Sequence, residues 1–268
     1  MKIRKIIIYS VLVFVSVICL FWIYTLFINA TRSGSDMRGI KLVPSKYLFV
    51  NLGNLLTSSL PVLNSIKNSF IVSTVCAFGC VYFASLCAYG FHMYDFKCKK
   101  VLFLFLMIVM MVPPQVGILG YVDLARKIGL TDSLWSIIFP RMSVPVTFYY
   151  IYQFMKVEVS KTYIEAARID GAGELVTFHK IIFPMLKSAL VVQLVFEFVY
   201  NWNSLFVPAV MLSSDKKKTL AIVVAFLRSM DDGMLYAMMA LAIIPIVLVY
   251  LVLSKQIISG ITAGGIKE

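Results

Sequence analysis

Hydrophobic residues occur along this chain in long runs, and polar residues are largely confined to the segments between them. A helix needs about 20 apolar residues to cross the hydrocarbon core of a bilayer. Runs of this length predict six transmembrane helices, with approximate bounds 6–28, 69–91, 101–122, 134–155, 184–212 and 233–254. We therefore expect an all-α fold, an integral membrane bundle in which residues 1–268 form a single transmembrane domain.

Composition supports a membrane protein. Of the 268 residues, 60% are hydrophobic and only 14% are charged, whereas soluble domains carry roughly 25% charged residues. The net charge of +12 would suit a nucleic-acid partner. However, the basic residues cluster between the apolar runs, as membrane-flanking anchors do, so we expect no nucleic-acid partner. The five cysteines show no metal-binding spacing and indicate neither a disulfide nor a metal site.

The first apolar run is too long for the core of a signal peptide, so it is interpreted as a membrane helix. Lysine and arginine are slightly more numerous on the side of the membrane that would hold the two termini. Because basic residues favour cytoplasmic loops, this bias predicts that both termini are cytoplasmic.

The inner connection 157–183 carries the most specific pattern in the chain. It contains a short helical stretch with two small residues, a glycine break, a second short stretch and a proline at the next helix start. A glutamate in the first stretch could close an ordinary capping box from Thr162. The residues that make up the pattern are Glu165, Ala166, Ala167, Asp170, Gly171, Ile181 and Pro184.

Taken together, this spacing resembles the EAA loop of permease subunits in binding-protein-dependent (type I) ABC importers. That loop reads Glu-Ala-Ala, three residues, Gly, nine residues and then Ile-x-Leu-Pro, and this chain departs from it only at Phe183. The resemblance implies that the seven residues above form a cytoplasmic coupling helix and its flanks, which contact a separate ATPase.

Further stretches resemble the maltose-type carbohydrate permeases, among them 129–133, Trp202-Asn203 and the ending 260–267. This resemblance implies import of a carbohydrate, in particular an oligosaccharide, across a bacterial cell membrane. The implied partners are a second homologous permease subunit in a heterodimer, two ATPase subunits and an extracytoplasmic sugar-binding protein. The sequence lacks a GxxxxGK[ST] loop, so this chain is expected to be no enzyme and to hold no cofactor, with ATP and Mg bound by the ATPase.

Polar residues recur on one face of the fifth predicted span. They either line a translocation path, with Tyr200 or Trp202 as a surface on which a sugar could stack, or form hydrogen bonds that fix helix packing. Both interpretations remain open at this point. The path residues would be Gln193, Glu197, Tyr200, Asn201, Trp202 and Ser204. Arg141, inside the fourth span, is expected to snorkel or to form an ion pair.

The glycine-rich ending is expected to contact the ATPase through Gly260, Thr262, Gly264 and Gly265, because the maltose-type tail does so. Two other functions stay possible on sequence grounds. One is an importer of the same architecture for a polyamine, phosphate or an amino acid. The other is a membrane-embedded enzyme or ion channel, for which a single acidic residue inside the spans is poor support.

Overall fold

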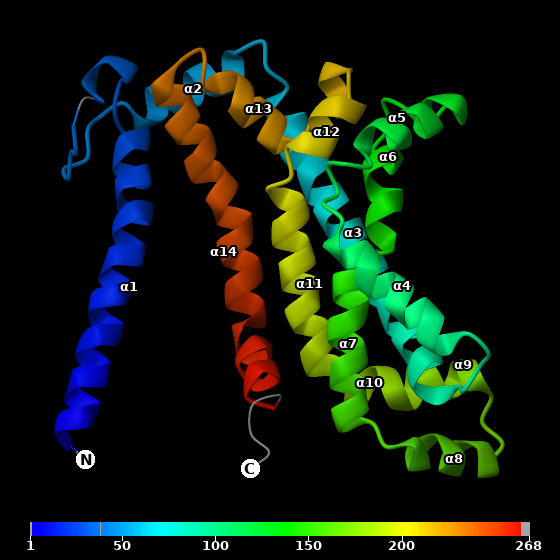
Figure 1. Cartoon of the computed structure of the whole chain (residues 1–268). Helices are drawn as coiled ribbons and strands as arrows, with labels where there is room; N and C mark the ends of the chain where they lie inside the picture. Colours follow the sequence, from blue (N-terminus) through cyan, green and yellow to red (C-terminus); the bar gives the residue numbers. More distant parts are fainter. Residues whose placement is uncertain (1, 38, 264–268) are drawn as a thin grey trace.

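The computed structural model describes residues 2–37 and 39–263, and in these ranges it contains helices and no β-strand. Long helices stand side by side, and short helices lie across both ends of the bundle (Figure 1). The expected all-α fold class is confirmed. In chain order the elements are α1 (Lys2–Ala30), η1 (Gly34–Asp36), α2 (Leu48–Thr57), α3 (Val62–Met93), α4 (Lys99–Met111), α5 (Ile118–Lys127), α6 (Trp135–Ile138), η2 (Phe139–Met142), α7 (Pro145–Glu158), α8 (Lys161–Ile169), α9 (Glu174–Thr177), the π-helix η3 (Phe178–Ile182), α10 (Phe183–Met185), α11 (Lys187–Trp202), α12 (Phe206–Met211), η4 (Asp215–Lys217), α13 (Leu220–Leu227) and α14 (Asp232–Ala263).

Among the described residues, three helices are long and apolar enough to cross a membrane: Arg4–Ala30, Val62–Met93 and Asp232–Gln256. A fourth candidate is a bent pair, in which Glu174–Met185 meets Lys187–Trp202 at 80°. Helix α11 stands upright in the bundle, whereas α9 and α10 run along its lower end (Figure 1). The chain is therefore a multi-pass membrane protein.

Two neighbouring prolines interrupt the span that the sequence predicts at 101–122. Helix α4 ends at Met111, and the next helix, α5, begins at Ile118. Pro113 and Pro114 lie between them. Proline lacks a backbone N–H, its ring clashes with the preceding turn, and the residue before it is pushed out of the helical region.

The spans predicted at 134–155 and 184–212 are also broken. Helix α6 ends at Ile138, η2 follows it and ends at Met142, and α7 begins at Pro145. In the second case α11 ends at Trp202, and α12 follows as a separate short helix. Hydropathy detects the apolar character of these runs, but it does not detect the backbone breaks within them.

Helix α3 lies at the centre of the bundle and packs against α7 and α11. Its buried face consists mostly of small side chains, which allow helix backbones to approach closely in a membrane. These side chains are Ser65, Ser69, Ser73, Cys76, Ala77, Cys80, Ala84, Ser85 and Ala88.

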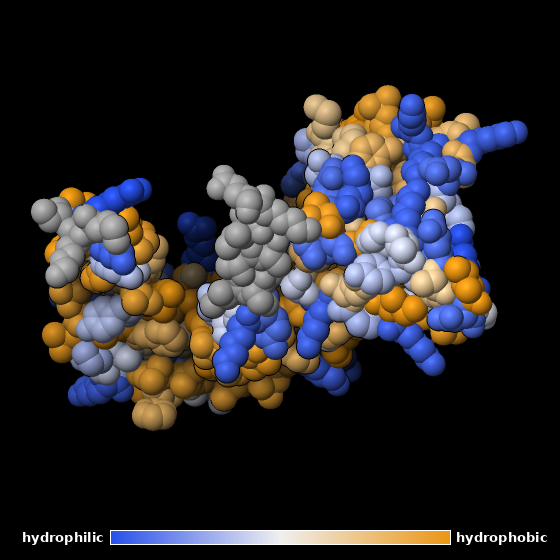
Figure 2. All heavy atoms as spheres, turned by 90° about the horizontal axis from the view of Figure 1, so that it is seen from below, coloured by the Kyte–Doolittle hydropathy of each residue, from blue (hydrophilic) through white to orange (hydrophobic). Residues whose placement is uncertain are grey.

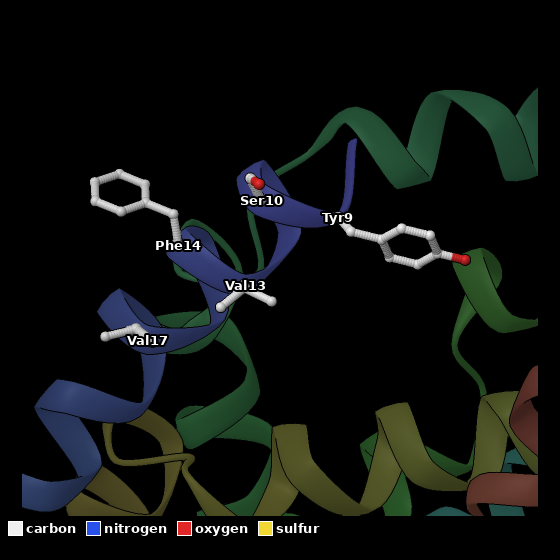
Figure 3. A pocket seen from close by; sticks show the side chains of 5 residues that line it. All are labelled: Tyr9, Ser10, Val13, Phe14 and Val17. Carbon is white, nitrogen blue, oxygen red and sulfur yellow. The ribbon is translucent and has the colours of Figure 1, made fainter. Parts of the chain in front are cut away.

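Helix α1 contacts α14 within this chain, but its most apolar stretch buries none of its residues. A helix that is apolar on all sides is stable where lipid or another membrane protein surrounds it. Figure 3 shows one part of this surface, where side chains from α1 alone fan out from the helix. They are Tyr9, Ser10, Val13, Phe14 and Val17.

At the upper end, Asn51 of α2 joins the end of α1 to the start of α14. Its side-chain amide donates to the carbonyl oxygens of Ala30 at 2.9 Å and Arg32 at 2.7 Å. A Cβ on Gly233 would lie 2.8 Å from the Asn51 side-chain oxygen. The absence of a side chain at Gly233 therefore allows the start of α14 to lie close to the Asn51 side chain.

Candidate functional site

Helix α8 follows α7 after a turn of two residues. The Ser160 side chain caps α8 by accepting the N–H of Thr162 at 3.3 Å. Thr162 is thus the second residue of the helix and not its cap. The alternative capping box from Thr162 to Glu165 is therefore wrong, and Glu165 is not engaged at the helix start.

The faces of α8 differ sharply in exposure. Ile164 and Ala167 are buried, and Ile164 belongs to the core cluster at the lower end of the bundle. Glu165, Ala166 and Ile169 face outward, and Ile169 is 86% exposed. The two alanines therefore lie on different faces of α8. Ala167 packs against the bundle, whereas Ala166 is exposed, and its small side chain would let another protein approach the helix closely. In the described part of the chain, the Glu165 side chain makes no hydrogen bond or ion pair.

A glycine turn ends α8. Gly171 has φ +79°, in the left-handed region that favours glycine. The N–H of Gly171 donates to the carbonyl of Arg168 at 3.0 Å, and the N–H of Ala172 donates to that of Ala167 at 2.9 Å. This pair of hydrogen bonds is a Schellman motif. It redirects the chain into α9, and Asp170 lies exposed at the helix end.

The last residues of the loop form the bend into α11. Ile181 is half-buried in the π-helix, and Pro184 is exposed near the start of α10. Seen from below (Figure 2), hydrophilic residues gather over the part of the molecule that carries α8 and α9, whereas hydrophobic residues dominate the flanks. The N-terminal end of α1 and the C-terminal end of α14 lie at this same lower end (Figure 1).

The polar face of α11 points into the chain. Gln193, Glu197 and Asn201 are all buried. The Glu197 carboxylate accepts a hydrogen bond from the hydroxyl of Thr147 at 2.8 Å and forms an ion pair with the Arg141 guanidinium. Of the two expectations for Arg141, snorkelling and ion pairing, the structure shows the ion pair. An ion pair with added hydrogen bonds is the form in which charges persist inside a membrane. These contacts favour the packing interpretation for this face.

The two candidate aromatic residues differ in exposure. Trp202 is 2% exposed, stacks on Phe198 and donates its indole N–H to the carbonyl of Ala242 at 3.1 Å. Tyr200 is 51% exposed, and the Arg141 guanidinium lies 4.1 Å from the centre of its ring. Of the two, Tyr200 is the aromatic side chain that another molecule can reach. Ser204 is half-buried just beyond the end of α11.

The chain matches one known protein family over most of its length. The family described as binding-protein-dependent transport system inner membrane component matches residues 81–262, which is more than half of the chain. The chain belongs to this family. The match includes α8, the glycine turn and α11, so the residues expected to contact an ATPase lie within the family region.

Two relatives match this transport component over nearly its whole length. The arabinooligosaccharides transport system permease protein AraQ of Bacillus subtilis is 28% identical over 259 residues, covering 94% of this chain and 92% of AraQ. The glucose import system permease protein GlcU of Saccharolobus solfataricus is 30% identical over 271 residues, covering 96% of this chain and 93% of GlcU.

A solved structure shares the fold. It is the crystal structure of a bacterial ABC transporter involved in the import of the acidic polysaccharide alginate. One of its chains matches with a TM-score of 0.80 at 20% identity, over 95% of this chain and 96% of that chain. The broken helices of the transport component therefore belong to an arrangement already seen in a crystal.

Several contacts around these sites were not expected from the sequence. Asp132, with φ 51°, accepts the N–H groups of Ser213 at 2.9 Å and Ser214 at 3.0 Å and also pairs with Lys217. Hydrogen bonds from Ser214 and its neighbours hold the pKa of Asp132 well below its ordinary value. Lys218 pairs with Asp215 at 2.6 Å. Two of the three lysines in the basic run 216–218 are therefore paired with aspartates.

The tail residues fall in two groups. Gly260 and Thr262 belong to the last turns of α14, because that helix continues to Ala263. Gly264 and Gly265 lie outside the described residues. The expected ATPase contact of the tail stays a prediction.

Replacing Glu197 tests the packing role of the buried ion pair. The Glu197→Leu variant leaves the Arg141 guanidinium unpaired and should destabilise the protein by about 3 kcal/mol. The double variant Arg141→Met with Glu197→Leu removes both charges and should recover most of that loss. Thermal unfolding of the detergent-solubilised protein measures both effects, with Glu158→Leu as control because Glu158 forms no ion pair in the described residues. A double variant as unstable as the single one would contradict the pairing.

Proposed function

We propose that this chain is the transmembrane permease subunit of an ATP-driven (ABC) importer and that it moves a carbohydrate, in particular an oligosaccharide, into the cytoplasm. The substrate would arrive from an extracytoplasmic sugar-binding protein. A second, homologous permease subunit would complete the pore, and two separate ATPase subunits would bind ATP and Mg. Both termini would be cytoplasmic, in the cell membrane of a bacterium.

The outward face of α8 supports the ATPase contact. Exposed apolar side chains that gather into a patch mark sites of protein–protein interaction. Here Ile169 is 86% exposed and Leu175, in the following helix, is 69% exposed. Glu165 and Ala166 are also exposed on α8. A small side chain and a carboxylate that makes no ion pair within the described residues suit a cleft with basic groups. This accessible combination is the observation that carries the proposal.

The substrate class rests on the relatives and on α11. The printed names of the two relatives concern arabinooligosaccharides and glucose. Tyr200 offers an exposed aromatic ring beside the bundle interior, and sugar rings have an apolar face that stacks on such a ring. Because Gln193, Glu197 and Asn201 bond or pack within the chain, we place Tyr200 at the translocation path and assign the others to its support.

A substrate panel tests the function as a whole. Vesicles would contain this chain, its partner permease and the ATPase, with the binding protein outside. We expect ATP-dependent accumulation of at least one labelled carbohydrate from a panel of arabinotriose, raffinose and glucose. ATP-dependent accumulation of spermidine, phosphate or an amino acid, with none of the sugars, would overturn the substrate class.

Changing Gly171 tests the coupling loop. Valine at φ +79° strains the backbone by roughly 1–2 kcal/mol or more, although its Cβ would meet no atom within 4 Å. The Gly171→Val variant should therefore assemble but hydrolyse ATP with little transport, because the turn no longer aims α8. Gly173→Val is the matched control, since Gly173 has φ −71° and ψ 158°, which valine adopts readily. Equal transport by the two variants would contradict this role.

Removing the exposed ring tests the path. The Tyr200→Ala variant should lower the rate of uptake about fivefold, which corresponds to roughly 1 kcal/mol of lost stacking. Tyr200→Phe keeps the ring and should transport normally. Tyr250→Ala serves as control, because Tyr250 is equally exposed on α14. If Tyr200→Ala transported like the control, Tyr200 would not belong to the path.

A further inference from the structure

A carboxylate beside the glycine turn connects α8 to the spanning helix α3. Oε1 of Glu174 accepts from Nε of Arg168 at 2.9 Å and from Nη2 at 2.8 Å. Its Oε2 accepts the hydroxyl of Tyr89 at 2.7 Å. Arg168 is the basic residue in the last turn of α8, Glu174 is the first residue of α9, and Tyr89 belongs to α3. One carboxylate therefore bridges three helices.

The Tyr89 end of this bridge is rigid. The Tyr89 side chain is buried, and its ring lies 5.4 Å from that of Phe178, which is itself fully buried. Because Phe178 follows Glu174 in the same loop, this ring contact packs Tyr89 of α3 directly against the loop. The hydroxyl, by contrast, is aimed at the carboxylate. Tyr89 thus connects the bridge firmly to the backbone of α3.

The Arg168 end of the bridge spans the non-helical turn between α8 and α9. Between α8 and α9 the chain turns at Gly171, and residues 170–173 form no helix. Without a link across this turn, α8 could pivot about the glycine. The side chains of Arg168 and Glu174 are about half exposed, at 45% and 44%. An ion pair so exposed contributes little stability, so its value lies in fixing the angle between the helices.

Two further hydrogen bonds connect the same face of α3 to the loop. The hydroxyl of Tyr82 lies 3.1 Å from Nε2 of His179, and Nε2 of His92 lies 2.9 Å from the carbonyl oxygen of Val159. Positions 82, 89 and 92 are separated by seven and three residues, so they share one helix face. Of these three links, the one through Glu174 reaches a side chain of α8, and the Arg168 guanidinium also lies 5.7 Å from the ring centre of Tyr94, the residue that caps the end of α3.

We propose that Glu174 is a positioning residue that, with Arg168 and Tyr89, transmits a displacement of α8 to α3. This inference rests on the proposed function, in which an ATPase moves α8. When the ATPase pulls α8, the Arg168–Glu174 pair keeps α9 at a constant angle to it, and the Tyr89 hydroxyl passes the displacement to α3. Because α3 packs against α7 and α11, the movement reaches the bundle.

The experiment uses the complete importer in vesicles and measures two quantities. One is ATP hydrolysed per molecule transported, with the carbohydrate that the unaltered chain transports from the panel of arabinotriose, raffinose and glucose. The other is the yield of ATPase that co-purifies with the chain. The variants are Glu174→Ala, Tyr89→Phe and the two combined. Their controls are Glu158→Ala and Tyr150→Phe, because neither side chain forms a hydrogen bond or ion pair in the described residues.

We expect the ATPase yield to stay unchanged in all variants and the ATP consumed per transported molecule to rise about fivefold in Glu174→Ala and Tyr89→Phe. The combined variant should be no worse than the worse single one, because both remove the same link. Glu174→Gln keeps an acceptor oxygen and should recover part of the loss.

Two results would overturn the inference. One is normal ATP consumption per molecule in both single variants. The other is loss of the ATPase from both, which would make these residues part of the docking surface instead of a link. Failure of the proposed function is distinguishable, because the unaltered chain would then transport none of the panel sugars with ATP.

Discussion

Close packing of small side chains along α3 is the constraint on which the rest of the bundle depends. Lipid is as apolar as a leucine side chain, so helices in a membrane gain little by burying apolar surface against one another. Serine, alanine and cysteine on the buried face of α3 let α7 and α11 come close. At the upper end of α3, Asn68 donates to the carbonyls of Lys216 and Lys218, and Ser69 accepts the N–H of Leu220. At the lower end Tyr82 and Tyr89 contact His179 and Glu174 of the connection 157–183, so α3 joins the two ends of the molecule.

The surrounding lipid also requires that charged side chains inside the membrane be paired. Arg141 lies on the short helix η2, next to the break before α7, and it needs a partner because an isolated guanidinium in hydrocarbon is costly. Glu197 of α11 is that partner, and Thr147 at the start of α7 satisfies the other carboxylate oxygen. The pair thereby joins the broken fourth span to the fifth. A polar helix face that periodicity identifies can thus serve packing, whereas Tyr200 beside it is exposed.

Local features were predictable from the sequence, and distant contacts were not. The apolar runs correctly indicated a helical membrane protein, but among the described residues only three helices, or four with the bent pair, are long and apolar enough to span, so the predicted six stay unconfirmed. The glycine at 171 was expected in a helix-ending turn, where the structure has φ +79°. The breaks inside three runs escaped hydropathy, although prolines mark two of them, at Pro113 and Pro114 and at Pro145. The Thr162 capping box failed because Ser160, two residues earlier, caps the helix instead. The contact between Tyr89 and Glu174 joins residues 85 positions apart, and no periodic pattern carries that information.

The way α8 is held suits a part that must move as a unit. Only Ile164 and Ala167 of α8 are buried, so apolar packing alone holds it weakly. Its direction depends instead on the Schellman turn and on the carboxylate of Glu174, which are specific in geometry but contribute modest energy. A helix held in this way can be displaced by a protein partner without unfolding the bundle. Because its polar link ends on a buried tyrosine of α3, such a displacement acts on the helix that packs against both α7 and α11. Helix α8 is thus held weakly by apolar packing, which lets it move, and firmly in direction by polar contacts. Both properties are needed if it is to pass a movement from the lower surface into the membrane.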